Sequence, residues 1–242
     1  MSLWIKICGN TTLEDAQLAA EAGADALGFV FAPSPRRVTV ERTAAMVPHL
    51  PAAIEKIGVF VDAALDEIAS TVERCCLTGV QLHFDAGPAL AAQLRERFGA
   101  KLRILRVVHL DAQQRSGEGG LASGHSFSGR ESSRGTVEAL ASKRCLSDPN
   151  VDAILVDSRT GAAVGGTGQA YDWTLAGKIL FQNAETRKPL VAAGGLTPEN
   201  VAEAIGTLRP WGVDVVTGVE AAPGRKDPSR VLAFIANARS AG

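Results

Sequence analysis

The chain has 242 residues and a formal net charge of −1 at pH 7, and apolar residues make up 46% of it but aromatic ones only 5%. Such a balanced charge excludes a strong attraction to nucleic acid or to anionic membrane surfaces. No apolar stretch reaches the roughly 20 residues of a membrane span, and the N-terminus lacks the basic-then-apolar pattern of a secretory signal. We therefore expect a cytoplasmic protein with no nucleic-acid or membrane partner.

Short apolar runs alternate with amphipathic segments along the whole chain, and helical spacing is clearest over 65–72 and 201–208. The runs expected to be buried strands are Trp4–Cys8, Ala26–Phe31, Lys56–Val61, Gly79–His83, Leu102–Val108, Ala153–Asp157, Pro189–Ala193 and Val213–Thr217. Eight strand-then-helix repeats close naturally into one α/β barrel, the (β/α)8 or TIM barrel, with residues 1–242 as a single domain. The alternative is an open doubly wound sheet, which the strand count disfavours.

Three short patterns indicate where helices begin and end. Thr11 with Glu14 can form a capping box for the first helix, and Gly23 suits its end. Thr197-Pro198 places a capping hydroxyl and a first-turn proline at the start of the next-to-last helix. One stretch, 111–140, is rich in Ser, Gly and Arg and nearly lacks apolar periodicity. We expect it to be a long, mobile surface insertion after the fifth strand.

The first and sixth strands end on residues that can move a proton. In a barrel of this kind the active site lies at the carboxyl ends of the strands, where Cys8 and Asp157 stand. Side-chain alternation puts Lys6 on the same side as Cys8, and a nearby cation would favour the thiolate. Apolar neighbours before Asp157 would favour its protonated form and so suit a general acid. The bland alternatives are a buried inert thiol and a loop-capping carboxylate.

The last two strands are followed by glycine-bearing turns. Gly194-Gly195 and Thr217-Gly218 stand where such barrels commonly bind phosphate. Glycine lets backbone N–H groups approach an anion without a Cβ in the way. Tight turns without a ligand are the alternative, so the prediction depends on both turns lying at one end of the same barrel.

Other polar residues are expected at the mouth of the barrel. Arg36 and Arg37 follow the second strand: an arginine there could clamp a carboxylate with two parallel hydrogen bonds, whereas at least one of the two could be a solvated surface residue. His83 ends the fourth strand and could contact a substrate or belong to a polar rim. The four cysteines form no CxxC pair, and no Walker, Rossmann or HExxH motif is present. The sequence thus supports neither a metal nor a nucleotide cofactor.

Taken together, these segments resemble phosphoribosylanthranilate isomerase, an enzyme family of tryptophan biosynthesis. The segments that carry the resemblance are Lys6-Ile7-Cys8-Gly9, Gly23–Phe31 running on to Ser34-Pro35-Arg36, Gly58–Val61, Val80–His83, Leu155–Asp157, Gly165–Gly168 with Asp172-Trp173, Ala193–Leu196 with Pro198–Val201, and Val213-Asp214 through Glu220. They span nearly the whole chain in the family's order.

The resemblance implies an Amadori rearrangement of a small phosphosugar, N-(5-phosphoribosyl)anthranilate, without a cofactor. It assigns the general acid to Asp157, the general base to Cys8 and the anthranilate contact to Arg36. It further implies that Asp214 contacts the substrate and that Gly194, Gly195, Thr217 and Gly218 bind its phosphate. Two positions depart from the family pattern: Phe84 replaces the glycine that usually follows His83, and Ala193 replaces a serine.

Three alternatives stay open at this point. The chain could be a catalytically silent barrel that binds a phosphosugar. It could also be a bifunctional isomerase that serves histidine biosynthesis, although Cys8 argues against this because such barrels resemble one another in having an aspartate there. Finally, because family members occur fused to other enzymes of the pathway, the chain could be a domain of a multifunctional polypeptide.

Overall fold

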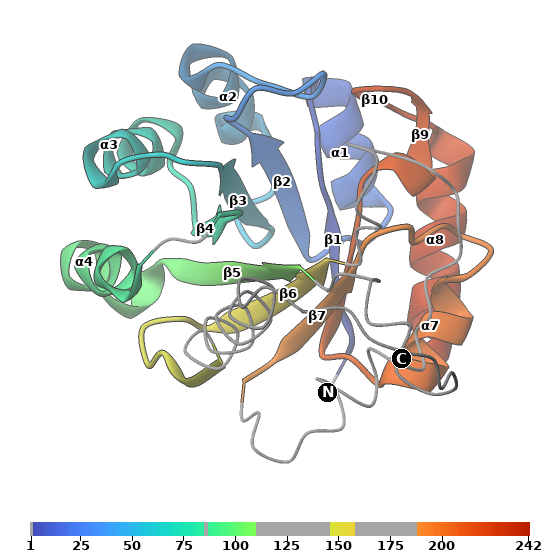
Figure 1. The fold of residues 1–242 in the computed structure, drawn as a ribbon. Helices are drawn as coiled ribbons and strands as arrows, with labels where there is room; N and C mark the ends of the chain where they lie inside the picture. Colours follow the sequence, from blue (N-terminus) through green and yellow to red (C-terminus); the bar gives the residue numbers. More distant parts are fainter. Residues whose placement is uncertain (1, 85–86, 110–145, 158–187) are drawn as a thin grey trace, which may run out of the picture.

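The computed structural model describes residues 2–84, 87–109, 146–157 and 188–242. Eight parallel strands form a closed barrel in chain order, and the last strand pairs with the first (Figure 1). These strands are β1 Trp4–Ile7, β2 Ala26–Val30, β3 Glu55–Phe60, β4 Gly79–Leu82, β5 Arg103–His109, β6 Ala153–Asp157, β7 Leu190–Ala193 and β8 Gly212–Val215. The predicted α/β barrel is therefore confirmed, although β8 ends before the predicted Thr217.

Helices cover the outside of the barrel: α7 lies beside α8, α8 lies beside α1, and α2, α3 and α4 follow one another around the barrel (Figure 1). The described helices are α1 Leu13–Glu21, α2 Val40–Met46, α3 Leu65–Cys75, α4 Pro88–Phe98, α7 Val201–Leu208 and α8 Pro228–Ala241, with short 3-10 helices η1 Val47–His49, η2 Gly99–Lys101 and η4 Thr217–Val219. A small antiparallel pair, β9 Glu220–Ala222 and β10 Arg225–Lys226, follows β8. The predicted insertion at 111–140 lies outside the described residues.

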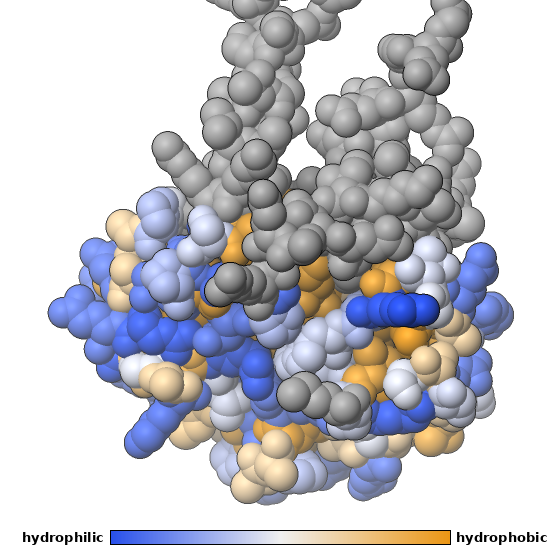
Figure 2. Space-filling model, turned by 90° about the horizontal axis from the view of Figure 1, so that it is seen from below, coloured by the Kyte–Doolittle hydropathy of each residue, from blue (hydrophilic) through white to orange (hydrophobic). Residues whose placement is uncertain are grey.

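Apolar side chains fill the barrel and the layer outside it. One buried cluster, with Trp4, Ile57, Leu105, Leu155 and Val191 among its members, takes alternate residues of strands all around the barrel, as its interior requires. Two larger clusters pack the opposite strand faces against the helices. In the view of Figure 2, hydrophilic residues cover much of the described surface and apolar ones form separate patches. None of the described helices is long and apolar enough to cross a membrane.

The predicted helix termini are only partly correct. The cap of α1 is Thr12, whose hydroxyl accepts from the N–H of Asp15, whereas Thr11 donates to the carbonyl of Gly224. Gly23 follows this helix with a φ of 97°, as predicted. Helix α7 starts at Val201 rather than at Pro198, because Thr197 and Asn200 close a separate turn through a 2.8 Å bond between the Thr197 N–H and the Asn200 Oδ1.

Helix α8, near the C-terminal end of the chain, is held against β1, near the N-terminal end. Its Phe234 is fully buried, while Leu232 on the same helix is 53% exposed. Arg239 donates to the Asp25 carboxylate at 2.7 Å, and the same carboxylate oxygen accepts from the N–H of Ile5 in β1. The helix is therefore held to the strands both by apolar contact and by a polar link.

We expect Phe234→Ala to lower the free energy of unfolding by about 3–5 kcal/mol, because a large buried ring is lost and a cavity is left. The matched variant Leu232→Ala should change it by no more than about 0.5 kcal/mol, since half of that side chain is already in water. Urea denaturation followed by circular dichroism measures both. Equal losses in the two variants would contradict the packing of α8 described here.

Candidate active site

Cys8 and Asp157 both lie at the carboxyl ends of their parallel strands, as the sequence predicted. Both are buried, with exposures of 3% and 8%. They come from β1 and β6, which are not neighbours in the barrel. A series of polar side chains crosses the interior between them: it runs from Lys6, two residues before Cys8, through Gln81 to His83, and the His83 Nε2 lies 3.9 Å from the Asp157 Oδ2.

This series of polar side chains begins at an ion pair inside the barrel. Lys6 is fully buried, and its Nζ donates to the Asp214 Oδ1 at 2.8 Å and to the Gln81 Oε1 at 2.9 Å. Because β1 and β4 are not neighbours, the bond between Lys6 and Gln81 spans the interior. Burial by itself lowers the pKa of Lys6, but the charges of Asp214 and Cys8 more than offset it, so the pKa is raised overall. The sequence placed Lys6 beside Cys8, but it indicated neither the ion pair with Asp214 nor a role for Gln81.

The thiol of Cys8 does not have the lowered pKa that its neighbouring cation suggested. Burial raises its pKa, and so does the nearby Asp214; Lys6 and Lys226 act in the opposite direction without reversing the result. The sequence-based expectation was correct about the neighbour and wrong about the balance, because complete burial costs a thiolate more than one already paired ammonium returns. Cys8 is therefore a thiol whose conversion to thiolate requires an alkaline pH or a further change at the site.

The backbone around Cys8 leaves room only for a small neighbour. A Cβ added to Gly28 of β2 would lie 2.4 Å from the Cys8 Sγ, a clash that glycine avoids. The turn after the strand passes through Gly9, with a φ of 75°. Asn10 then stabilises this turn, because its Nδ2 donates to the carbonyls of Ile7 and Gly28 at 2.8 and 3.2 Å.

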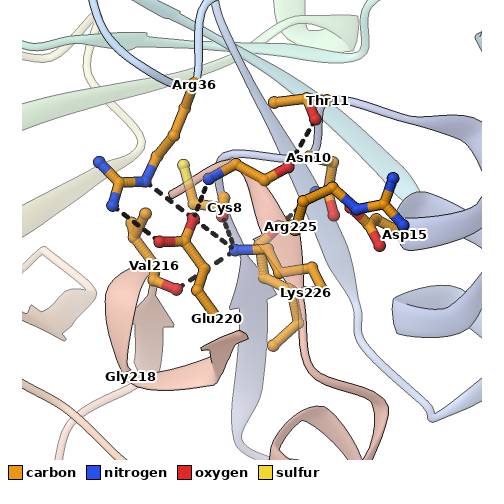
Figure 3. A network of polar contacts seen from close by, with 12 residues as sticks. Cys8, Asn10, Thr11, Asp15, Arg36, Val216, Gly218, Glu220, Arg225 and Lys226 are labelled. Carbon is orange, nitrogen blue, oxygen red and sulfur yellow. Dashed lines mark hydrogen bonds and ion pairs between the residues drawn. The ribbon is translucent and has the colours of Figure 1, made fainter. Parts of the chain in front are cut away.

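Arg36 faces Glu220 across the mouth of the barrel (Figure 3). Its Nε and Nη2 donate to the two carboxylate oxygens of Glu220 at 2.8 and 2.7 Å, a bidentate geometry that fixes the plane of the guanidinium. These bonds to Glu220 raise the pKa of Arg36. By contrast Arg37 is exposed, which matches the alternative of a solvated surface residue.

Lys226 of β10 connects the same network to the backbone of Cys8. Its Nζ donates to the carbonyl of Cys8 at 2.6 Å and to that of Val216 at 3.2 Å, and it lies 3.6 Å from Glu220 (Figure 3). The side chain is fully buried. Sequence reasoning missed this lysine, because it lies beyond the last barrel strand, 218 residues from its partner.

The two glycine turns lie against each other. Gly194 and Gly195 have φ values of 86° and 65°, a conformation that side chains disfavour. A Cβ on Gly218 would lie 1.9 Å from the carbonyl oxygen of Leu196, so the loops after β7 and β8 are in direct backbone contact there. Thr217 is exposed at the start of η4. This is the adjacency that the predicted phosphate site depends on.

The remaining predicted positions are placed as follows. His83 is half-buried beside Asp157. Asp214 lies one layer below Cys8, in the ion pair with Lys6. Phe84 packs against the outer apolar cluster that includes Leu82. The glycine-rich segment 165–168 lies outside the described residues. Within the described ranges, no group of three or more His, Cys, Asp and Glu side chains could hold a metal ion.

We expect Gly218→Ala to destabilise the protein by about 1–3 kcal/mol, because the new methyl group must push the loop after β7 away. Gly206→Ala in α7 is the control: a Cβ there meets nothing within 4 Å, and alanine should stabilise the helix by about 0.4–1 kcal/mol. Thermal or urea denaturation distinguishes the two. A neutral Gly218→Ala variant would show that the loops are not in contact.

Comparison with known proteins agrees with this arrangement. The family model for N-(5'-phosphoribosyl)anthranilate (PRA) isomerase matches residues 5–118 and 133–237. The N-(5'-phosphoribosyl)anthranilate isomerases of Geotalea uraniireducens and Citrifermentans bemidjiense are 39% and 40% identical to the chain over 236 residues, which are 97% of this chain and 98% and 96% of theirs.

Solved structures agree as well. The phosphoribosylanthranilate isomerase of Thermotoga maritima superposes with a TM-score of 0.78 at 34% identity and covers 98% of this chain and 99% of its own. An isomerase of the same name in complex with reduced 1-(o-carboxyphenylamino)-1-deoxyribulose 5-phosphate gives a TM-score of 0.74 at 33% identity, with the same coverage. The chain therefore belongs to the N-(5'-phosphoribosyl)anthranilate isomerase family.

Proposed function

We propose that Asp157 is the general acid and Cys8 the general base of the Amadori rearrangement that this tryptophan-pathway isomerase catalyses. The reaction converts N-(5-phosphoribosyl)anthranilate to 1-(2-carboxyphenylamino)-1-deoxyribulose 5-phosphate. The observation that carries the assignment is a buried thiol and a buried carboxyl group at the same end of the barrel, with the polar side chains of Lys6, Gln81 and His83 between them.

The proposed chemistry assigns one proton transfer to each residue. Asp157 gives a proton to the furanose ring oxygen while the bond from that oxygen to C1 breaks, and the nitrogen lone pair forms the iminium. The Cys8 thiolate then takes the proton from C2, and the electrons of the C–H bond move toward the cationic nitrogen. The iminium nitrogen is the electron sink, so a modest base suffices. The enolamine so formed tautomerises to the ketone with water, which supplies the proton that C1 gains and takes the one that the C2 hydroxyl loses. The thiol of Cys8 returns its proton through water to the carboxylate of Asp157, which restores both residues.

Binding of the substrate is assigned to one charged side chain and to two loops rich in backbone N–H groups. Arg36 would hold the anthranilate carboxylate: its bonds to Glu220 use only part of the N–H donors of the guanidinium and fix its orientation. The phosphate would lie on Gly194, Gly195, Thr217 and Gly218, where backbone N–H groups can approach it. His83 and Asp214 would contact the sugar or support the groups that do.

The location and the wider context of the chain are proposals of the same kind. A biosynthetic isomerase of this family is expected to act in the cytoplasm. Membership of a longer, multifunctional polypeptide stays a hypothesis that the size of the native protein would test.

Cys8→Ala and Asp157→Ala should each remove nearly all turnover, since one proton transfer loses its carrier, and general acid or base groups typically contribute about 10²–10⁴-fold. The decay of anthranilate-type fluorescence measures the rate directly. Cys76→Ser, at an exposed cysteine, is the control and should keep full activity. Full activity in either alanine variant would contradict the assignment, and binding of the substrate without turnover by the wild-type protein would favour a silent barrel.

The pH dependence follows from the environment of Cys8. Burial raises the pKa of this thiol, so the Cys8 thiolate should appear only through a midpoint above the ordinary thiol value of about 8.5. The difference in ultraviolet thiolate absorbance between the wild-type protein and Cys8→Ala, followed from neutral to alkaline pH at constant ionic strength, measures this midpoint. A midpoint below neutrality would contradict the buried environment of the thiol described here.

A further inference from the structure

The hydrogen bonds in the series of polar side chains that crosses the barrel have a definite donor-to-acceptor direction. The Lys6 Nζ lies 2.9 Å from the Gln81 Oε1, and the Gln81 Nε2 lies 3.2 Å from the Nδ1 of His83. On the other side of the imidazole, the Nε2 of His83 faces the Oδ2 of Asp157 at 3.9 Å. Lys6 and Gln81 are buried. The backbone N–H of His83 donates to the carbonyl of Phe60 at 2.9 Å, which fixes the end of β4.

Lys6 sets that direction because an ammonium group can only donate. The group of Gln81 that faces it must be the carbonyl oxygen, and the amide nitrogen must then face His83. An amide nitrogen is also only a donor, so the Nδ1 of His83 has to be an unprotonated acceptor. A neutral imidazole that accepts at Nδ1 carries its proton at Nε2.

The charge on Lys6 is itself fixed. Asp214 accepts from it at 2.8 Å in the interior of the barrel, and the pKa of Lys6 is raised in spite of burial. A flip of the Gln81 amide would place an N–H group against an ammonium and leave two buried donors facing each other, which costs free energy. The orientation of the whole chain therefore follows from the ion pair between Lys6 and Asp214.

We propose that Lys6 and Gln81 are positioning residues that hold His83 as the neutral tautomer with its proton on Nε2, directed at the Asp157 Oδ2. The proposal about catalysis rests on the proposed role of Asp157 as general acid. In the proposed reaction the Nε2–H group faces Oδ2, and the proton that passes to the ring oxygen leaves from Oδ1. An imidazolium at this place would instead favour the carboxylate and oppose proton donation.

The distance of 3.9 Å between the His83 Nε2 and the Asp157 Oδ2 exceeds a hydrogen bond. Hydrogen bonds of catalytic groups are often long before substrate binds and shorten in the complex. The tautomer, by contrast, is already determined by the buried chain and does not require the substrate. The tautomer is thus a property of the protein alone, whereas the shortening of the distance belongs to the complex with substrate.

Nitrogen-15 NMR of protein labelled at histidine tests the tautomer directly. The chain has four histidines, and His83→Gln identifies the signals of His83 by their loss. At neutral pH we expect Nδ1 to resonate as an unprotonated ring nitrogen and Nε2 as a protonated one. A proton on Nδ1 in the wild-type protein would overturn the proposal.

Variants at Gln81 test the cause. Gln81→Glu offers a carboxylate that accepts from both Lys6 and an Nδ1–H group, so the proton should appear on Nδ1 of His83. Gln81→Met removes the donor and should give a mixture of tautomers. In both, kcat should fall by about tenfold or more with a smaller change in KM. Leu82→Met, a volume-conserving change on the outward face of the same strand, should leave the His83 signals and kcat unchanged.

Two results would separate this proposal from the proposed function. If Gln81→Met keeps the wild-type His83 signals, the chain from Lys6 does not set the tautomer, whatever the activity. If the tautomers change as expected but Asp157→Ala stays active, the positioning of His83 stands and the assignment of the acid fails. The wild-type spectrum alone decides the tautomer if Gln81→Glu does not fold.

Discussion

The site depends on the ion pair between Lys6 and Asp214, which lies where a barrel of this type ordinarily has apolar side chains. Buried charges are costly unless they are paired and hydrogen-bonded. Here the ammonium satisfies the carboxylate of Asp214 and the carbonyl of Gln81 together. The ammonium and carboxylate groups therefore have fixed positions in the layer just below Cys8. Gln81 accepts from this ammonium, and in our proposal His83 takes its orientation from Gln81.

A second set of contacts holds the rim of the site. Glu220 binds Arg36 through both oxygens, and Lys226 binds the carbonyl of Cys8 (Figure 3). Arg36 lies in the loop after β2, and Glu220 and Lys226 lie in the β9–β10 pair near the other end of the sequence. Arg36 and the backbone of the proposed base are thereby parts of one connected network. A ligand that engages Arg36 would therefore meet Cys8 in a fixed relation, which is what proximity contributes to catalysis.

Alternation of apolar and amphipathic segments was enough to predict the eight strands, and the ends of β1 and β6 led to Cys8 and Asp157. Local patterns failed where two equivalent residues compete: Thr11 and Thr12 both suit a cap, and only the contact of Thr11 with Gly224 decides between them. The role of Lys226 depends on a hairpin that returns to the first strand. Whether the pKa of Cys8 is raised or lowered depends on how deeply the thiol is buried, which residue spacing alone does not reveal.

The contact between Cys8 and Gly28 ties two positions of the chain together. A Cβ at position 28 would lie 2.4 Å from the sulfur, so a side chain there would force the thiol to turn away or the strands to move. The chemistry available at the end of β1 thus depends on the absence of a side chain on β2.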